Sequence, residues 1–85
     1  MAVNAPEWLV KRGGSLTPGP YGDVWFVMLQ GEPQYKLAPV PVAGKYGCAI
    51  TQTINGKPIP STTPADTAEA AIQGGLEDLR KVLGW

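Results

Sequence analysis

The longest unbroken apolar segment of the chain, Val24 to Leu29, lies within residues 23–30, DVWFVMLQ. Valine, tryptophan and phenylalanine favour strands, and successive side chains of a strand point to opposite faces. Both faces of this strand are apolar, because Val24, Phe26 and Met28 alternate with Trp25, Val27 and Leu29. A strand with one solvated face would alternate apolar and polar residues instead. We therefore expect both faces to be covered, by this chain or by a partner.

Glycine and proline divide the rest of the first sixty residues into short segments that favour extended structure. The predicted strands are residues 7–12 (EWLVKR), 34–42 (QYKLAPVPV) and 48–54 (CAITQTI). We expect residues 1–6 to be a loose leader, and residues 15–22 and 43–47 to be a loop and a turn. Pro39 and Pro41 lack backbone donors two residues apart, so the end of their strand should lie at a sheet edge or leave the sheet.

The stretch TQTINGKPIPST, residues 51–62, predicts a hairpin that turns at Asn55-Gly56. Asn-Gly favours a two-residue type I′ turn, which would pair Thr53 with Pro58 and Gln52 with Ile59. In that register Pro58 and Pro60 occupy sites whose N–H groups would point away from the partner strand. The prolines are therefore compatible with a hairpin and guard its outer edge against further pairing.

Residues 64–83 have the three- and four-residue spacing of an amphipathic helix. Thr63 is the expected N-cap, Pro64 the first helical residue and Asp66 a first-turn acid, and Gly84 is the expected stop. The predicted apolar face consists of Ala65, Ala68, Ile72, Gly75, Leu76, Leu79 and Leu83. Gly75 would allow the helix to approach the sheet closely, whereas Gly74 has no such role on this face.

These segments predict one α+β domain over residues 1–85: an antiparallel meander of four to five short strands (7–60), with the C-terminal helix (64–83) packed across one face. The pattern does not say which face of strand 23–30 the helix covers. The apolar stripe on the face that the helix does not cover needs a Pro-rich loop or a second chain to cover it.

Composition and charge argue against several functional classes. The chain has seven basic and seven acidic residues and no histidine, so we expect neither a broad electrostatic attraction for nucleic acid or membrane nor imidazole chemistry. We expect no catalytic residues, no metal site and no cofactor. The single cysteine, Cys48, is read as a small buried hydrophobe, and the absence of a signal-like start predicts a cytoplasmic protein.

The leading hypothesis is a non-catalytic protein-interaction module, possibly a homodimer, that acts through the second sheet face. The residues expected to make the contact are Trp8, Trp25, Val27, Leu29 and Tyr35. The alternative is nucleic-acid binding through basic and aromatic strand residues, with Lys11, Arg12 and Lys57 as the contacts. A small-ligand protein or an enzyme is the third possibility, and the sequence offers no positive sign of a pocket.

Residues 46–83 loosely resemble the HicB-type antitoxins and related partial double-stranded-RNA-binding-domain folds, in which a strand and a glycine-containing turn precede a helix that begins with Thr and Glu-Ala. The matching stretch here is TTPADTAEAAIQGGLEDL. The hairpin NGKPIPS stands where that pattern has a Pro- and Gly-containing loop, and no functional residue is carried over.

Overall fold

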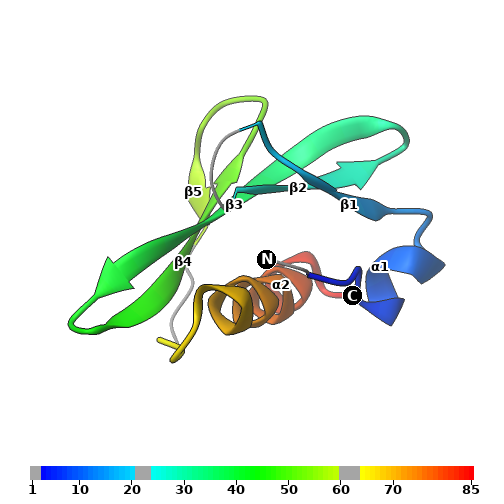
Figure 1. The fold of residues 1–85 in the computed structure, drawn as a ribbon. Helices are drawn as coiled ribbons and strands as arrows, with labels where there is room; N and C mark the ends of the chain where they lie inside the picture. Colours follow the sequence, from blue (N-terminus) through cyan, green and yellow to red (C-terminus); the bar gives the residue numbers. More distant parts are fainter. Residues whose placement is uncertain (1–2, 21–23, 60–63) are drawn as a thin grey trace.

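The computed structural model describes residues 3–20, 24–59 and 64–85. Its elements are α1 (Glu7–Lys11), β1 (Ser15–Pro18), β2 (Trp25–Leu29), β3 (Glu32–Val42), β4 (Lys45–Gln52), β5 (Pro58–Ile59) and α2 (Ala68–Leu83). The strands form one antiparallel sheet in chain order, and both helices lie on the same side of it (Figure 1). The predicted α+β meander with a C-terminal helix across one face is confirmed.

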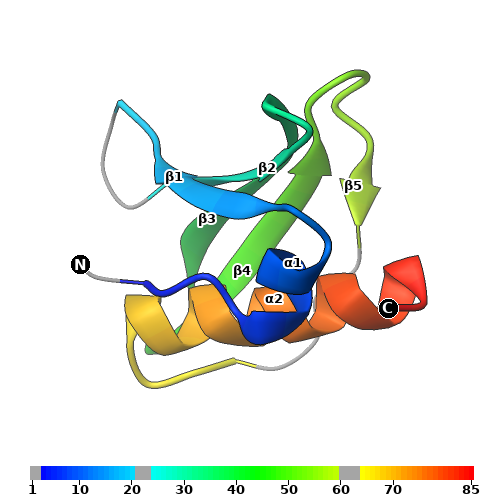
Figure 2. The same cartoon turned by 90° about the vertical axis from the view of Figure 1, so that its right-hand side faces the viewer.

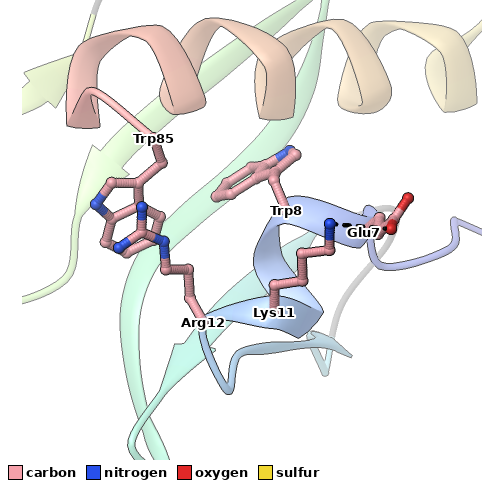
Figure 3. A pocket seen from close by; sticks show the side chains of 5 residues that line it. All are labelled: Glu7, Trp8, Lys11, Arg12 and Trp85. Atoms are coloured by element: carbon pink, nitrogen blue, oxygen red, sulfur yellow. Dashed lines mark ion pairs between the residues drawn. The ribbon is translucent and has the colours of Figure 1, made fainter.

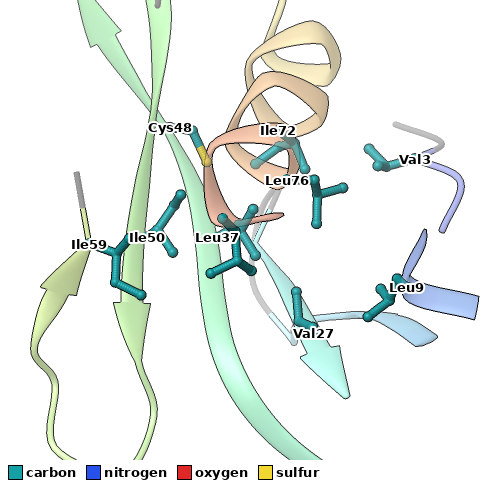
Figure 4. Close-up of a cluster of buried hydrophobic side chains, with 10 residues drawn as sticks. Val3, Leu9, Val27, Leu37, Cys48, Ile50, Ile59, Ile72 and Leu76 are labelled. Carbon is teal, nitrogen blue, oxygen red and sulfur yellow. The ribbon is translucent and has the colours of Figure 1, made fainter. Parts of the chain in front are cut away.

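The hydrophobic core lies between this side of the sheet and α2 (Figure 4). Leu37 of β3 and Ile50 of β4 are directly paired, and both are almost completely buried. Ile72 and Leu76 of α2 pack against them from the helix. The remaining buried members of the cluster are Val3, Leu9, Val27, Cys48, Ile59 and Leu79.

The helix α2 begins four residues later than predicted. Ala65 exchanges two backbone hydrogen bonds with Tyr46 of β4, at 2.7 and 2.8 Å, so the chain is still extended there and Pro64 is not the first helical residue. Thr67 is the N-cap, and its hydroxyl accepts a hydrogen bond from the Ala70 N–H at 3.1 Å. Asp66 precedes the cap instead of lying in the first turn, and the predicted cap Thr63 lies outside the described residues.

The two adjacent glycines of α2 face different surroundings, as the apolar pattern indicated. A Cβ added to Gly75 would collide with Cys48 and lie 3.4 Å from Leu37 Cδ2, so the helix approaches the sheet at a point where no side chain fits. A Cβ added to Gly74 would meet nothing within 4 Å. The close-approach role predicted for Gly75 is confirmed.

Residues 7–12 were predicted to be a strand, and this prediction is wrong because Glu7–Lys11 is a helix. Leu9 is completely buried in the core, and Lys11 pairs with Glu7 one helical turn away. Gly13, at φ 76°, ends the helix, where the Gly14 N–H donates to the Leu9 carbonyl at 2.9 Å. A five-residue helix shows too little periodicity to be distinguished from a strand, so burial of one leucine decides the conformation.

Two more segments near the N-terminus were predicted incorrectly. Val3 is only 7% exposed and belongs to the core, so the described part of the predicted leader is not loose. Ser15–Pro18, predicted to be loop, forms the edge strand β1, in which Leu16 pairs with Val27 of β2. Pro18 is tolerated there because an edge strand has one side without ladder partners.

The strands β2, β3 and β4 are joined by two tight turns with positive φ at both central residues, as type I′ geometry requires. These turns are Gln30-Gly31 and Ala43-Gly44. The second is shorter than the predicted 43–47 turn, since β4 already begins at Lys45. β2 pairs with β3 only as far as Leu37, so the Pro39–Pro41 end of β3 has a strand partner on one side only among the described residues. This agrees with the predicted sheet edge.

The Asn55-Gly56 hairpin is present, but its predicted register and turn type are wrong. Ile50 pairs with Ile59 and Thr51 with Pro58, two residues away from the predicted pairing, so the loop has four residues, 53–56. Only Gly56 of the Asn-Gly pair has positive φ. The observed register brings Ile59 into the core at 8% exposure and leaves Ile54 87% exposed. Because the shift is by two residues, each side chain stays on the face of the sheet that was predicted for it. Pro60 lies outside the described residues.

Candidate functional site

The Trp25, Val27, Leu29 face of β2 lies on the side of the sheet that carries both helices (Figure 1 and Figure 2), which settles the question that the sequence left open. Val27 is fully buried, and Trp25, Leu29 and Tyr35 are partly buried against the core. The predicted interaction residues on β2 and β3 therefore lie on the helix side of the sheet. The prediction that these residues form an exposed surface is wrong for Val27. Trp25, Leu29 and Tyr35 mainly pack against the core.

The opposite side of the sheet has no helix on it in the described part of the chain (Figure 2). We call it the open face, and by strand register it comprises Ser15, Thr17, Val24, Phe26, Met28, Lys36, Ala38, Val40, Val42, Lys45, Gly47, Ala49 and Thr51. None of these side chains packs against the core cluster. Small and β-branched residues form most of this face, and its charged residues are Lys36 and Lys45.

Part of the open face is covered by the segment that follows β1. The Gly19 N–H donates to the Val24 carbonyl at 2.7 Å, and a Cβ on Gly19 would lie 3.2 Å from the Phe26 ring. A hollow of about 230 Å³ remains beside it, lined by Pro20, Val24, Phe26 and Lys36. Two parts of this face therefore differ: the segment after β1 covers it near Phe26, and the surface is open near Val40, which is 36% exposed.

A second candidate site lies where the C-terminal ends of the two helices meet (Figure 3). We call it the helix-end pocket; it has a volume of about 320 Å³ and is lined by Glu7, Trp8, Lys11, Arg12 and Trp85. Arg12 immediately precedes the glycine that ends α1, and Trp85 immediately follows the glycine that ends α2. The Trp85 N–H donates to the Arg80 carbonyl at 3.1 Å, which turns the chain back after the helix.

The rings and charges of the helix-end pocket are arranged in pairs. The Trp8 and Trp85 rings are 5.8 Å apart between centroids and tilted by 59°, a favourable aromatic geometry. The Arg12 guanidinium carbon lies 5.0 Å from the Trp85 centroid, within cation–π range. Lys11 Nζ is 3.2 Å from Glu7 Oε1, and both side chains are largely exposed. The pocket thus combines two indoles with two cations and one carboxylate.

The indole N–H of Trp8 is buried and has no hydrogen-bond acceptor within the described residues. In Figure 3 this nitrogen is turned toward α2 and not toward Arg12 or Lys11. Burying an unpaired donor costs about 1–3 kcal/mol. Trp8 therefore holds its position by ring packing against the core and Trp85.

The three residues predicted to contact nucleic acid lie at two separate places in the structure. Lys11 and Arg12 line the helix-end pocket together with Trp8, which the sequence had assigned to protein contact. Lys57 lies beside β5, at the opposite edge of the sheet from β1 and α1, where its N–H donates to Asn55 Oδ1 at 2.9 Å (Figure 1). One continuous surface through all three cations is not formed.

Cys48 is buried, as predicted, and faces α2 where Gly75 approaches. Burial raises the pKa of its thiol to about 12. A hydrogen bond with the Ala38 backbone lowers this pKa by a smaller amount, and the nearby Asp78 charge raises it slightly. A thiol of this kind stays protonated at neutral pH and is a poor nucleophile. Within the described residues no group of three or more Cys, Asp and Glu side chains could hold a metal ion, and no helix is long and apolar enough to cross a bilayer.

Sequence reasoning missed Glu7 and Trp85 as members of a site. Reading residues 7–12 as a strand placed Trp8 and Lys11 on different faces, whereas a helical turn brings Glu7 and Lys11 together. Trp85 directly follows a predicted helix stop, and a large aromatic residue after a C-terminal glycine was the available signal. Comparison with protein-family models, with curated proteins and with solved structures finds no significant match to this chain.

Proposed function

We propose that this protein is a non-catalytic interaction module that associates with a second copy of itself through the open face. The observation that carries the proposal is the apolar surface around Val40, Ala38 and Ala49, on the side of the sheet without a helix. Small side chains allow two sheets to pack face to face at about 10 Å. The face carries two lysines, Lys36 and Lys45, and Lys45 is paired with Asp66 at 3.5 Å, so the repulsion between two copies would be modest.

The sheet edges support a contact through the face and not through backbone pairing. The Val42–Lys45 pair flanks a two-residue turn and is hydrogen-bonded, so Pro39 and Pro41 fall at sites that point away from β4. Their missing donors leave the outer edge of β3 unable to pair with another strand. Pro58 likewise removes a backbone donor from the outer edge of β5. We propose in addition that this association takes place in the cytoplasm.

Sedimentation velocity at several protein concentrations tests this proposal. Val40→Lys places a charge on the open face, near the β3–β4 turn, and is expected to convert a concentration-dependent dimer into a monomer. Val82→Lys is the matched control, because Val82 is 56% exposed on α2 and lies on the other side of the molecule. A wild-type protein that remains monomeric at millimolar concentration would exclude self-association.

A further inference from the structure

The helix-end pocket has the composition of a ligand site, and it is separate from the open face. Its volume of about 320 Å³ is at the small end of the range of roughly 300–1,000 Å³ that is usual for ligand pockets. A large cofactor would not fit in this space, whereas one flat ring with a short charged arm has a suitable size.

The cations of the pocket are able to accept an anion. The interaction that the structure gives Arg12 is its contact with the Trp85 ring, and no carboxylate lies within 4 Å of the guanidinium among the described residues. A guanidinium that stacks on a ring keeps its edge N–H groups available for a carboxylate or a phosphate. Lys11 is held by Glu7 in a pair whose side chains are 72% and 83% exposed, and such a pair contributes little and is readily exchanged.

The rings of the pocket supply the second half of a recognition site. The two indoles lie side by side at the pocket wall, one from each end of the described chain. Stacking of a nucleobase on an aromatic side chain stabilises the complex and tolerates any base, because every base has a planar π-face. The same wall therefore offers two aromatic faces, tilted by 59° to each other, next to the guanidinium of Arg12 and the exposed Lys11–Glu7 pair.

From this juxtaposition we propose that the helix-end pocket binds a planar ring that carries an oxyanion, with a mononucleotide as the representative ligand. The ring stacks on one of the two indoles and meets the other at an angle, because the Trp8 and Trp85 rings are tilted by 59° to each other. The phosphate accepts hydrogen bonds from Arg12 and displaces Glu7 from Lys11. Glu7 is a competing anion in this arrangement and weakens ligand binding.

Isothermal titration calorimetry with AMP tests the site, with adenosine and inorganic phosphate as partial ligands. AMP is expected to bind at least about tenfold more tightly than either partial ligand, since only AMP uses both halves of the pocket. Arg12→Gln is expected to weaken AMP binding at least about tenfold. Glu7→Gln is expected to strengthen it several-fold, an opposite effect that a loss of folding cannot produce.

Lys57→Gln removes one positive charge at the far edge of the sheet and is the matched control for Arg12→Gln. It is expected to leave AMP affinity unchanged at constant ionic strength. Titration with a short oligodeoxyadenylate shows whether the pocket prefers a free nucleotide or a nucleotide within a single strand. Tighter binding of either one supports the site, provided that Arg12→Gln and Glu7→Gln have the stated effects. Absence of AMP binding at millimolar concentration, or equal losses in Arg12→Gln and Lys57→Gln, would overturn the proposal.

Discussion

The two faces of β2 carry equally apolar side chains but have different surroundings. Val27 is fully buried on the helix side of the sheet, whereas Phe26 is partly covered by the segment that follows β1. The difference comes from the neighbouring strands: the covered face continues into Leu37 and Ile50, and the open face continues into Lys36 and Thr51. The large apolar surface that a helix can bury is therefore present on one side only. The apolar content of a single strand does not reveal this.

The largest expected effect that separates the two faces is on the stability of the core. Leu37→Ala removes a completely buried side chain from the centre of the covered face and is expected to lower the free energy of unfolding by about 2–5 kcal/mol. Val40→Ala, on the open face of the same strand, is expected to cost under about 1 kcal/mol. Urea denaturation of both variants measures the difference, and equal losses would contradict the assignment of the faces.

The next effect concerns the contact between α2 and the covered face. Gly75→Ala places a methyl group against Cys48 and Leu37, and the resulting overpacking is expected to cost about 1–3 kcal/mol in spite of alanine's higher helix propensity. Thermal unfolding followed by circular dichroism is the measurement. A stabilised Gly75→Ala variant would mean that the helix lies farther from the sheet than the structure shows.

The buried thiol at this contact predicts a dependence of stability on pH. The pKa of Cys48 is raised from 9.0 to about 12 in the folded protein, so the unfolded chain loses this proton first. The stabilising contribution is present below pH 9 and is lost as the pH rises from 9 toward 12. At pH 10 the loss is about 1 kcal/mol.

Denaturation of Cys48→Ala over the same pH range is the control for this contribution. The difference between the two pH profiles isolates the thiol from the tyrosines and lysines, which titrate in the same range and are present in both proteins. Parallel profiles would show that the thiol is solvated and that the covered face is less tightly closed.

The smallest expected effect has the opposite sign. Gly74→Ala adds a methyl group where nothing lies within 4 Å, so the gain in helix propensity is unopposed. We expect stabilisation by about 0.5–1 kcal/mol, measured by the same thermal unfolding as for Gly75→Ala. A destabilised variant would show that the outer side of α2 is also in close contact.

The elements with long apolar patterns could be predicted from the sequence, and the short ones could not. The strand around Val27 was identified by its run of apolar, strand-favouring residues, and most of α2 by a helical period that repeats over several turns. The five residues of α1 and the four of β1 were assigned wrongly, since neither is long enough to show a period. Their conformations depend on Leu9 and Leu16, which reach the core from opposite ends of the Gly13-Gly14 turn.

For the candidate sites, single residues could be predicted from the sequence, but their assembly in space could not. The sequence identified Trp8, Lys11 and Arg12 individually, but it could not place Trp85 next to them, because this contact joins the two ends of the described chain. It also selected the wrong stripe of β2 as the exposed one. A strand's own pattern is symmetric when both faces are apolar, so only the partner strands can break the symmetry.

The sequence by itself determined the fold class, the position of the hairpins, the burial of Cys48 and the close approach at Gly75. These features depend on local pattern and turn chemistry, which act over a few neighbouring residues. The tertiary structure alone decided the face beneath α2, the register of the last hairpin and the assembly of the helix-end pocket. Each of these choices is made by burial of side chains that are distant in sequence, such as Ile59 against Ile50, and local preference contributes little to its free energy.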